Sequence, residues 1–194
     1  MKIGGLALQG AFIEHINILQ QLGVEALPVR LPNELGSLDG LIIPGGESTS
    51  ILNLMRSFNL IQPLREFAQA GSPIWGTCAG MICLAKKVSN PTNSIETLAV
   101  MDMEVRRNAF GRQVDSFETD LLVPALGNES FPGVFIRAPI IERVSPQVEI
   151  LTQLPSGVGI AARQGKLVAT AFHPELTNDL RLHSYFLEIA ASVE

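Results

Sequence analysis

Short apolar runs alternate with amphipathic segments along the first half of the chain. The runs predict buried strands at residues 2–8, 24–29 and 38–43. Apolar residues spaced three or four positions apart predict amphipathic helices over residues 11–22 and 60–70. Strands and helices that alternate in this way are typical of βαβ units around a parallel sheet.

The pattern changes after about residue 97, where short apolar runs alternate with turns rich in Gly, Pro and Asn. This predicts mixed or antiparallel strands added to the parallel core, at residues 101–105, 117–122, 134–136, 149–152, 159–162 and 167–172. A helix over residues 180–193 closes the chain, and the lack of repeats or linkers favours one domain over residues 1–194. The predicted fold is therefore α/β: a flavodoxin-like open mixed sheet with a mostly parallel core, helices on both faces and added antiparallel strands.

The composition narrows the class of protein. Of the 194 residues, 46% are hydrophobic and 17% are charged, as in a well-buried globular protein. The formal net charge is -5 and no Lys/Arg cluster is longer than a pair, which argues against nucleic acid as a partner. No apolar run approaches the roughly 20 residues needed to cross a bilayer, and the N-terminus lacks signal-peptide features. We therefore expect no membrane association and a cytoplasmic location.

The candidate nucleophile lies in the segment Gly76-Thr77-Cys78-Ala79-Gly80, between an apolar run and a helix-compatible segment. Two glycines flank Cys78 as they flank the serine of a G-x-S-x-G nucleophile elbow. A tight strand-to-helix turn brings neighbouring backbone close, so the flanking positions favour glycine. Free N–H groups at the start of the helix, together with its dipole, favour a thiolate. Most free cysteines are simply buried, and we expect that role for the second cysteine, Cys83.

A cysteine nucleophile needs a base, and the base needs an orienting partner. His15 and His183 lie on predicted helices, where we expect a solvated face for His15 and a structural role for His183. His173 instead follows the last predicted strand and precedes Pro174 and Glu175. If this segment is extended, His173 and Glu175 project to the same side, where the carboxylate could orient the imidazole and stabilise the imidazolium.

A glycine-rich segment, Pro44-Gly45-Gly46-Glu47-Ser48-Thr49-Ser50, follows the third predicted strand. Such a turn exposes backbone N–H groups at the carboxyl end of a strand, where doubly wound sheets bind ligands. Ser48 or Thr49 is a candidate N-cap for a helix over residues 51–58. From this segment alone, a plain loop is an equally good interpretation.

Together, these motifs resemble a known family. Residues 76–81 (GTCAGM) and His173-Pro174-Glu175 are similar to the motifs of class I (triad) glutamine amidotransferases, and residues 44–48 to their oxyanion loop. Further stretches resemble the glutaminase subunits of pyridoxal 5'-phosphate synthases: residues 6–12 (LALQGAF) with Glu14-His15, residues 107–113 (RNAFGRQ) and residues 135–139 (FIRAP). The resemblance extends from residue 2 to about residue 190.

The resemblance implies hydrolysis of L-glutamine to L-glutamate and ammonia through a cysteine thioester. Cys78 would attack the side-chain amide, His173 would transfer the proton, and Glu175 would orient His173. Backbone N–H groups of Gly46 and Ala79 would form the oxyanion hole. The substrate-binding residues implied by the resemblance are Gly46, Glu47, Ser48, Arg107, Ile136 and Arg137.

A partner is also implied, because ammonia released to water is lost to any synthesis. In the resembled family, the partner is a (β/α)8-barrel synthase subunit that builds pyridoxal 5'-phosphate within a large heteromeric complex. No metal or organic cofactor is implied for the glutaminase, and two cysteines are too few for a four-thiolate zinc site.

Three other interpretations stay open at this point. Another triad glutaminase, such as the one that feeds imidazole glycerol phosphate synthesis, would share the triad but not residues 107–113 or the Gln9-Gly10 turn. A non-catalytic binding or chaperone-like protein of flavodoxin-like architecture could use Cys78 as a redox-sensitive thiol, but it would need no orienting carboxylate. A cysteine peptidase is the weaker third interpretation.

Overall fold

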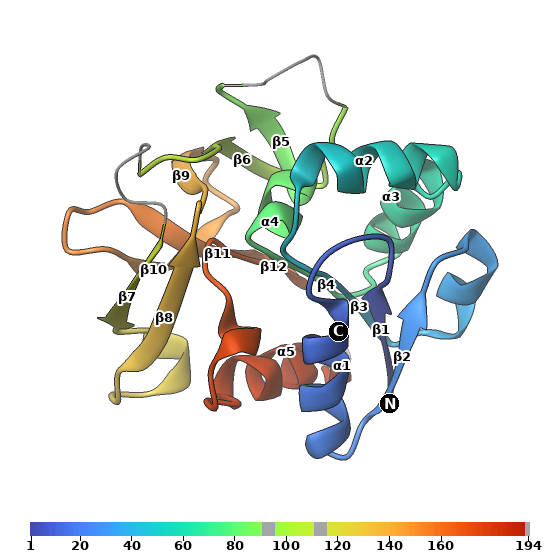
Figure 1. The fold of residues 1–194 in the computed structure, drawn as a ribbon, viewed down its shortest axis with the longest axis horizontal. Coiled ribbons are helices and arrows are strands. Elements are labelled where there is room, and N and C mark those ends of the chain that lie inside the picture. The colour runs from blue at the N-terminus through green and yellow to red at the C-terminus, as the bar shows by residue number, and fades with distance from the viewer. Residues whose placement is uncertain (91–95, 111–115, 193–194) are drawn as a thin grey trace.

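The fold is built around an open sheet (Figure 1) in a computed structural model that describes residues 1–90, 96–110 and 116–192. Five parallel strands make up one part of this sheet, in the order β2-β1-β3-β4-β12. Their bounds are β1 Lys2–Leu6, β2 Glu25–Val29, β3 Gly40–Ile43, β4 Ile74–Thr77 and β12 Leu167–Thr170. The parallel core is therefore confirmed, and the strand expected at residues 167–172 belongs to it rather than to the added strands.

The sheet continues from β12 as β11-β9-β6-β5, and β10 pairs with β11. The pairs β11–β12, β9–β11, β6–β9 and β10–β11 are antiparallel, as expected for strands added to the core, whereas β5 and β6 are parallel. The bounds are β5 Ala85–Val88, β6 Met101–Arg106, β9 Ile140–Val144, β10 Glu149–Gln153 and β11 Gly159–Gln164. A separate antiparallel pair consists of β7 (Ser116–Leu121) and β8 (Phe131–Ile136).

Helices cover both faces of the sheet, as the sequence predicts. Figure 1 shows α2, α3 and α4 on one side and α1 and α5 on the other. Their bounds are α1 Phe12–Gln21, α2 Ser48–Ser57, α3 Ile61–Gln69, α4 Ala79–Leu84 and α5 Arg181–Ala191. Short 3₁₀ turns lie at η1 Pro32–Ser37, η2 Pro124–Leu126 and η3 Pro174–Leu176. Within the described ranges, none of these helices is long and apolar enough to span a membrane.

The predicted start of α2 is wrong in one respect. Glu47, not Ser48 or Thr49, is the N-cap, and its carboxylate accepts hydrogen bonds from the backbone N–H groups of Thr49 and Ser50 at 3.0 and 2.7 Å. A carboxylate at this position satisfies free N–H groups and also interacts favourably with the helix dipole. The helix therefore begins at Ser48, three residues before the expected start.

The parallel strands are buried on both faces, which explains their uninterrupted apolar sequences. Leu41, Ile42 and Ile43 of β3 are fully buried, as is Trp75 of β4. Because β3, β4 and β12 are parallel neighbours, their carboxyl ends meet at one edge of the sheet. The three segments that follow these strands carry the glycine-rich loop, the cysteine elbow and the histidine, so the topology brings them together.

Candidate active site

Cys78 lies between β4 and α4 with a φ of 48°, a strained conformation for a residue with a side chain. A Cβ added to Gly76 would lie 2.5 Å from the backbone of Gly80, and one added to Gly80 would lie 2.0 Å from the carbonyl oxygen of Ile43. Larger residues are therefore excluded at both positions. This geometry confirms the predicted elbow, and the thiol contacts the carbonyl oxygen of Ile136 at 3.8 Å.

His173 follows β12 and is held at the site by its backbone, which donates to the carbonyl oxygen of Val134 in β8 at 2.8 Å. Its Nδ1 lies 2.7 Å from Oε1 of Glu175, whose side chain is fully buried. Since a carboxylate only accepts hydrogen bonds, Nδ1 carries the proton and Nε2 remains available to Cys78. Burial alone would lower the pKa of His173, but its interactions with Cys78 and Glu175 raise the pKa to about 10. The site therefore stabilises the imidazolium.

The predicted pairing of His173 with Glu175 is correct, but the predicted extended conformation is wrong. Residues Pro174–Leu176 form a 3₁₀ turn, in which Glu175 reaches back to His173. Pro174 suits the first position of such a turn because its fixed φ is helical and it has no N–H to satisfy.

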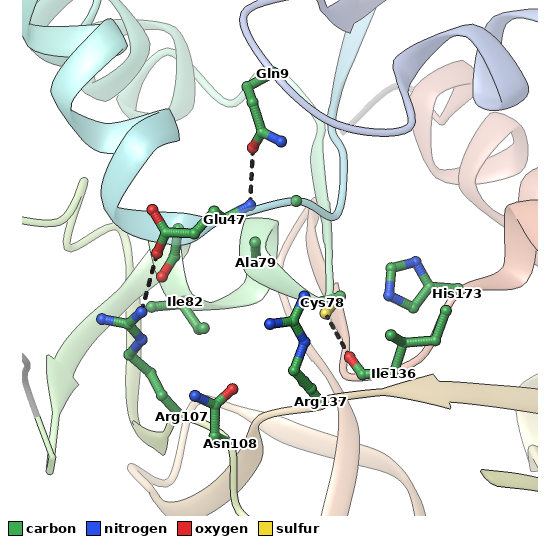
Figure 2. Close-up of a pocket in the computed structure, with 12 residues that line it drawn as sticks. Gln9, Glu47, Cys78, Ala79, Ile82, Arg107, Asn108, Ile136, Arg137 and His173 are labelled. Carbon is green, nitrogen blue, oxygen red and sulfur yellow. Dashed lines mark hydrogen bonds and ion pairs between the residues drawn. The ribbon is translucent and has the colours of Figure 1, made fainter. Parts of the chain in front are cut away.

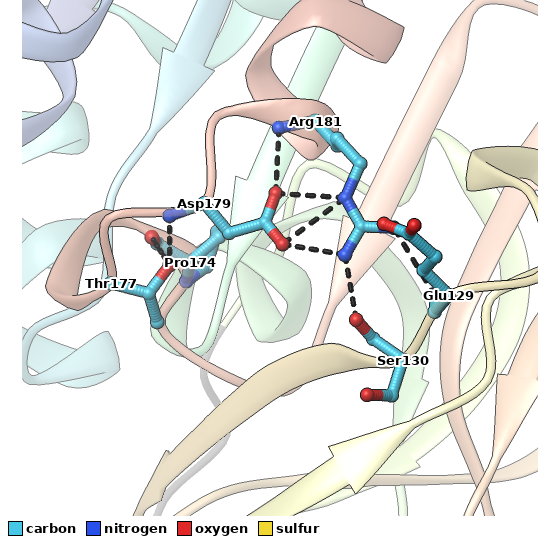
Figure 3. Close-up of polar contacts among 6 residues, drawn as sticks. All are labelled: Glu129, Ser130, Pro174, Thr177, Asp179 and Arg181. Atoms are coloured by element: carbon cyan, nitrogen blue, oxygen red, sulfur yellow. Dashed lines mark hydrogen bonds and ion pairs between the residues drawn. The ribbon is translucent and has the colours of Figure 1, made fainter.

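The segment after Glu175 is fixed by a polar cluster (Figure 3). The hydroxyl of Thr177 donates to the carbonyl oxygen of Pro174 at 3.0 Å and accepts from the N–H of Asp179 at 3.2 Å. Arg181 pairs with Asp179 at 2.6 Å and also donates to the carbonyl oxygen of Ser130, just before β8, at 2.6 Å. The cluster therefore ties the turn that carries Glu175 to the strand that supports His173.

The glycine-rich loop packs directly against the candidate base. A Cβ at Gly45 would lie 2.4 Å from Cε1 of His173, so this position requires glycine. The Gly45 carbonyl oxygen accepts from the backbone N–H of Ala11 at 3.1 Å, and the side chain of Gln9 accepts from the N–H of Glu47 at 2.8 Å. The loop is thus hydrogen-bonded to the segment between β1 and α1.

A pocket of about 390 Å³ opens beside Cys78 (Figure 2). It is lined by all of the predicted catalytic, oxyanion-hole and substrate-binding residues except the buried Glu175: Cys78, His173, Gly46, Ala79, Glu47, Ser48, Arg107, Ile136 and Arg137. It is also lined by three residues that were not predicted as site residues, Gln9, Ile82 and Asn108. The Gln9-Gly10 turn and the motif at residues 107–113 stand out in the sequence, but a single sequence does not indicate which of their side chains face a cavity.

The two predicted arginines differ in their surroundings. Nη2 of Arg107 lies 3.1 Å from Oε1 of Glu47, and Nη1 lies 3.4 Å from the hydroxyl of Thr49. Arg137 has a φ of 43° and forms no ion pair with any described residue. Figure 2 shows both guanidinium groups directed toward the pocket. The last three residues of the motif at 107–113 lie outside the described residues.

Two expectations about other residues have clear outcomes. Cys83 is fully buried, as predicted, and burial raises the pKa of its thiol to about 12. His15 was expected on a solvated face, and this is wrong: it is fully buried, as is His183, and Nε2 of His15 lies 3.4 Å from Oε2 of Glu175.

The fold is that of the glutamine amidotransferases. The chain belongs to the SNO glutamine amidotransferase family, whose sequence pattern matches residues 5–192. It is 57% identical over 190 residues to the pyridoxal 5'-phosphate synthase subunit PdxT of Dehalococcoides mccartyi, covering 98% of this chain and 97% of that protein. It is 58% identical over 188 residues to the subunit of the same name from Herpetosiphon aurantiacus, covering 96% and 99%. A crystal structure described as glutamine amidotransferase matches with a TM-score of 0.92 at 49% identity, covering 98% of this chain and 99% of that one.

Proposed function

We propose that Cys78, His173 and Glu175 hydrolyse L-glutamine to L-glutamate and ammonia through a cysteine thioester. The chain is the glutaminase subunit of a pyridoxal 5'-phosphate synthase, and its ammonia serves vitamin B6 synthesis. The observation that carries the proposed roles is the position of Cys78. Its backbone is strained at the elbow, and it lies next to His173, which is hydrogen-bonded to the buried carboxylate of Glu175. The expectations of a single domain and a cytoplasmic location stay predictions.

The reaction follows from the positions of the three side chains. Nε2 of His173 takes the proton of the Cys78 thiol, and the thiolate sulfur attacks the side-chain carbonyl carbon of glutamine. His173 then gives the proton to the leaving nitrogen, which departs as ammonia and leaves a thioester. Water attacks the thioester with His173 as base, which releases glutamate and restores the thiol. Glu175 stabilises the imidazolium in both halves of the reaction.

Two backbone N–H groups support the proposed oxyanion hole. Ala79 is the first residue of α4, so its N–H has no partner within the helix. The carbonyl of Gly45 is directed at Ala11, and in a trans peptide the N–H of Gly46 points the opposite way. One such donor is worth roughly 10²–10³ in rate, or about 3–4 kcal/mol, when it is aimed at the developing oxyanion.

The α-carboxylate and α-amino groups of glutamine need partners of opposite charge. Glu47 is a candidate for the amino group, because the pocket is lined by its side chain and its carboxylate stays ionised. Burial opposes the charged form of Glu47, but hydrogen bonds from Ser50 and Thr49 outweigh burial and lower its pKa to about 2. Arg107 and Arg137 are candidates for the carboxylate, since a guanidinium can bind a carboxylate in a bidentate manner.

We expect Arg137→Ala and Arg107→Ala to raise the KM for glutamine about 10- to 100-fold each. This factor corresponds to the binding free energy lost with one hydrogen-bonding group that is charged. The rate constant kcat should fall by a smaller factor, because the carboxylate is remote from the reacting carbon. Arg106→Ala is the matched control, since Arg106 pairs with Glu142 at 3.2 Å and does not line the pocket. Steady-state kinetics and thermal unfolding check this. A normal KM with a lower Tm would indicate a structural role for the arginine instead.

We also propose that the partner is a (β/α)8-barrel synthase subunit in a heteromeric complex, and that its docking switches the oxyanion loop. Two hydrogen bonds connect this loop to residues 9–11, so a partner that contacts this segment could affect the peptide between Gly45 and Gly46. Glycine residues allow this peptide to rotate at little steric cost. One orientation presents an N–H to the oxyanion, and the other presents a repelling carbonyl.

The assay for the proposed function is glutamate release by this chain, alone and with a matching synthase subunit. We expect clear release in the complex, low release by the isolated chain, and an increase in kcat larger than the decrease in KM. Equal rates with and without the partner would rule out the switch but leave the glutaminase intact. No glutamate release in either case would overturn the proposed function itself.

A further inference from the structure

A second polar cluster lies behind the triad, on the side of Glu175 that faces away from His173. It consists of His15 from α1, His183 from α5 and Thr77 from β4, all three fully buried. Burying polar side chains is unfavourable unless they are hydrogen-bonded. The reaction derived above uses neither of these histidines, so their burial next to a catalytic carboxylate needs a separate explanation.

The cluster forms a continuous line of polar contacts to the candidate base. Nε2 of His183 lies 2.9 Å from Nδ1 of His15. Nε2 of His15 lies 3.3 Å from the hydroxyl oxygen of Thr77 and 3.4 Å from Oε2 of Glu175. The other carboxylate oxygen of Glu175 is the one bonded to His173, at 2.7 Å. Helices α1 and α5 are therefore connected to His173 through Glu175.

The positions of the protons on the two histidines can be inferred from the atoms that have no partner. Among the described residues, the buried side-chain polar atoms without a hydrogen bond are Nδ1 of His183 and Oε2 of Glu175. A proton on Nδ1 of His183 would be a buried donor with no acceptor, so the proton belongs on Nε2, which donates to Nδ1 of His15. His15 then carries its proton on Nε2, facing Oε2 of Glu175. The reverse arrangement would direct a lone pair at the carboxylate.

The electrostatic environment agrees with neutral imidazoles. Burial, followed by the neighbouring His183 and His173, lowers the pKa of His15 well below its usual value. Burial lowers the pKa of His183 to about 4. Trp75 packs edge-on against both rings, with centroid distances of 5.6 Å to His15 and 4.9 Å to His183. The two rings are thus held in place by an apolar neighbour that keeps water away.

We propose that His15 is a positioning residue of the glutaminase: its Nε2–H faces Oε2 of Glu175 at 3.4 Å and, through this electrostatic contact, holds the carboxylate toward His173. His183 fixes the tautomer of His15, in the way that outer partners fix the histidines of metal sites. The proposal rests on the proposed function and adds two helices to its catalytic support. A neutral donor suits this position, because a cation at His15 would compete with the His173 imidazolium for the charge of Glu175.

Two substitutions of similar chemistry separate positioning from packing. The amide nitrogen of His15→Gln reaches the place of Nε2, whereas the shorter side chain of His15→Asn reaches only the place of Nδ1. In the complex with the synthase subunit, we expect His15→Asn to lower kcat about 10- to 100-fold, the range found for lost outer partners, with KM within about twofold. His15→Gln should recover most of kcat. Phe186→Leu is the packing control, since Phe186 is fully buried on α5 and its ring packs against Trp75.

A double-mutant cycle with Glu175→Gln provides the decisive measurement. If His15 acts through Glu175, His15→Asn should cost less than about threefold in kcat in that background. An equal factor in both backgrounds, or equal kcat for the Asn and Gln variants, would overturn the proposal. So would a wild-type kcat in His15→Asn. Glutamate release by the wild-type complex is measured in parallel, so a failure of the proposed function would be recognised separately.

Discussion

Cys78→Ala should abolish glutamine hydrolysis in the complex with the synthase subunit, with kcat falling by about 10⁴- to 10⁶-fold. The sulfur forms the bond to the substrate carbon, and no other described side chain in the pocket is a comparable nucleophile. Binding should survive, because the thiol is not among the groups proposed to hold the charged ends of glutamine. Glutamine affinity measured by calorimetry should therefore stay close to that of the wild type.

Cys83 supplies the internal control for this prediction. It is fully buried, and burial raises the pKa of its thiol to about 12, so it has little thiolate at neutral pH. A diazo-ketone analogue of glutamine should label Cys78 alone, and Cys83→Ala should leave both labelling and turnover in place. Labelling at Cys83, or full turnover by Cys78→Ala, would mean that the nucleophile has been assigned incorrectly.

The predictable part of this site is the cysteine elbow, because its sequence permits only one backbone arrangement without steric clashes. At the positions of Gly76 and Gly80 there is no room for a Cβ. The spacing of two glycines around Cys78 therefore indicates an elbow in the sequence itself. The parallel core was predictable for a similar reason, because strands buried on both faces read as continuous apolar runs. Strand β2 contains Pro28 and lies at the edge of the sheet, where the missing N–H of a proline is tolerated.

The parts that were missed depend on contacts across the chain. Strand β5 contains Lys86 and Lys87, which look like a polar loop but pair with Asp102 and Glu104 of β6 at 2.5 and 2.9 Å. Strand β9 was missed as well, and its apolar run is interrupted by a charged pair. Long-range pairing of this kind decides whether a polar segment becomes a strand, and no local pattern reports it.

His15 was misplaced although a signal for its burial exists. It lies three residues after Phe12 and four before Leu19, on the stripe that predicts the buried face of α1. A histidine on an apolar stripe is buried when partners are available, and its partners come from β4, α5 and the turn after β12. The conformation of residues 173–175 was mistaken because the sequence fixes the φ of Pro174 but not the 3₁₀ turn around it.

Substitutions of the base and of its carboxylate should have unequal effects. His173→Asn should lower kcat by about 10⁴-fold or more, because the variant has no group that can transfer the proton. Glu175→Gln should cost about 10²- to 10⁴-fold, because the imidazole remains but loses the charge that orients and stabilises it. Glutamate release by each complex checks the order. Near-wild-type rates for both variants would mean that the triad is misassigned.

The pH profile distinguishes loss of charge at Glu175 from general damage to the site. Against the effect of burial, Cys78 and Glu175 raise the pKa of His173 to about 10, so the imidazolium persists up to that pH. Removing the charge of Glu175 takes away one of the interactions that raise this pKa. The alkaline limb of kcat/KM, which reports the free enzyme, should therefore shift to lower pH in Glu175→Gln, toward the ordinary histidine value of about 6.5. A lower kcat with an unshifted alkaline limb would show that Glu175 supports the shape of the turn but does not stabilise the imidazolium.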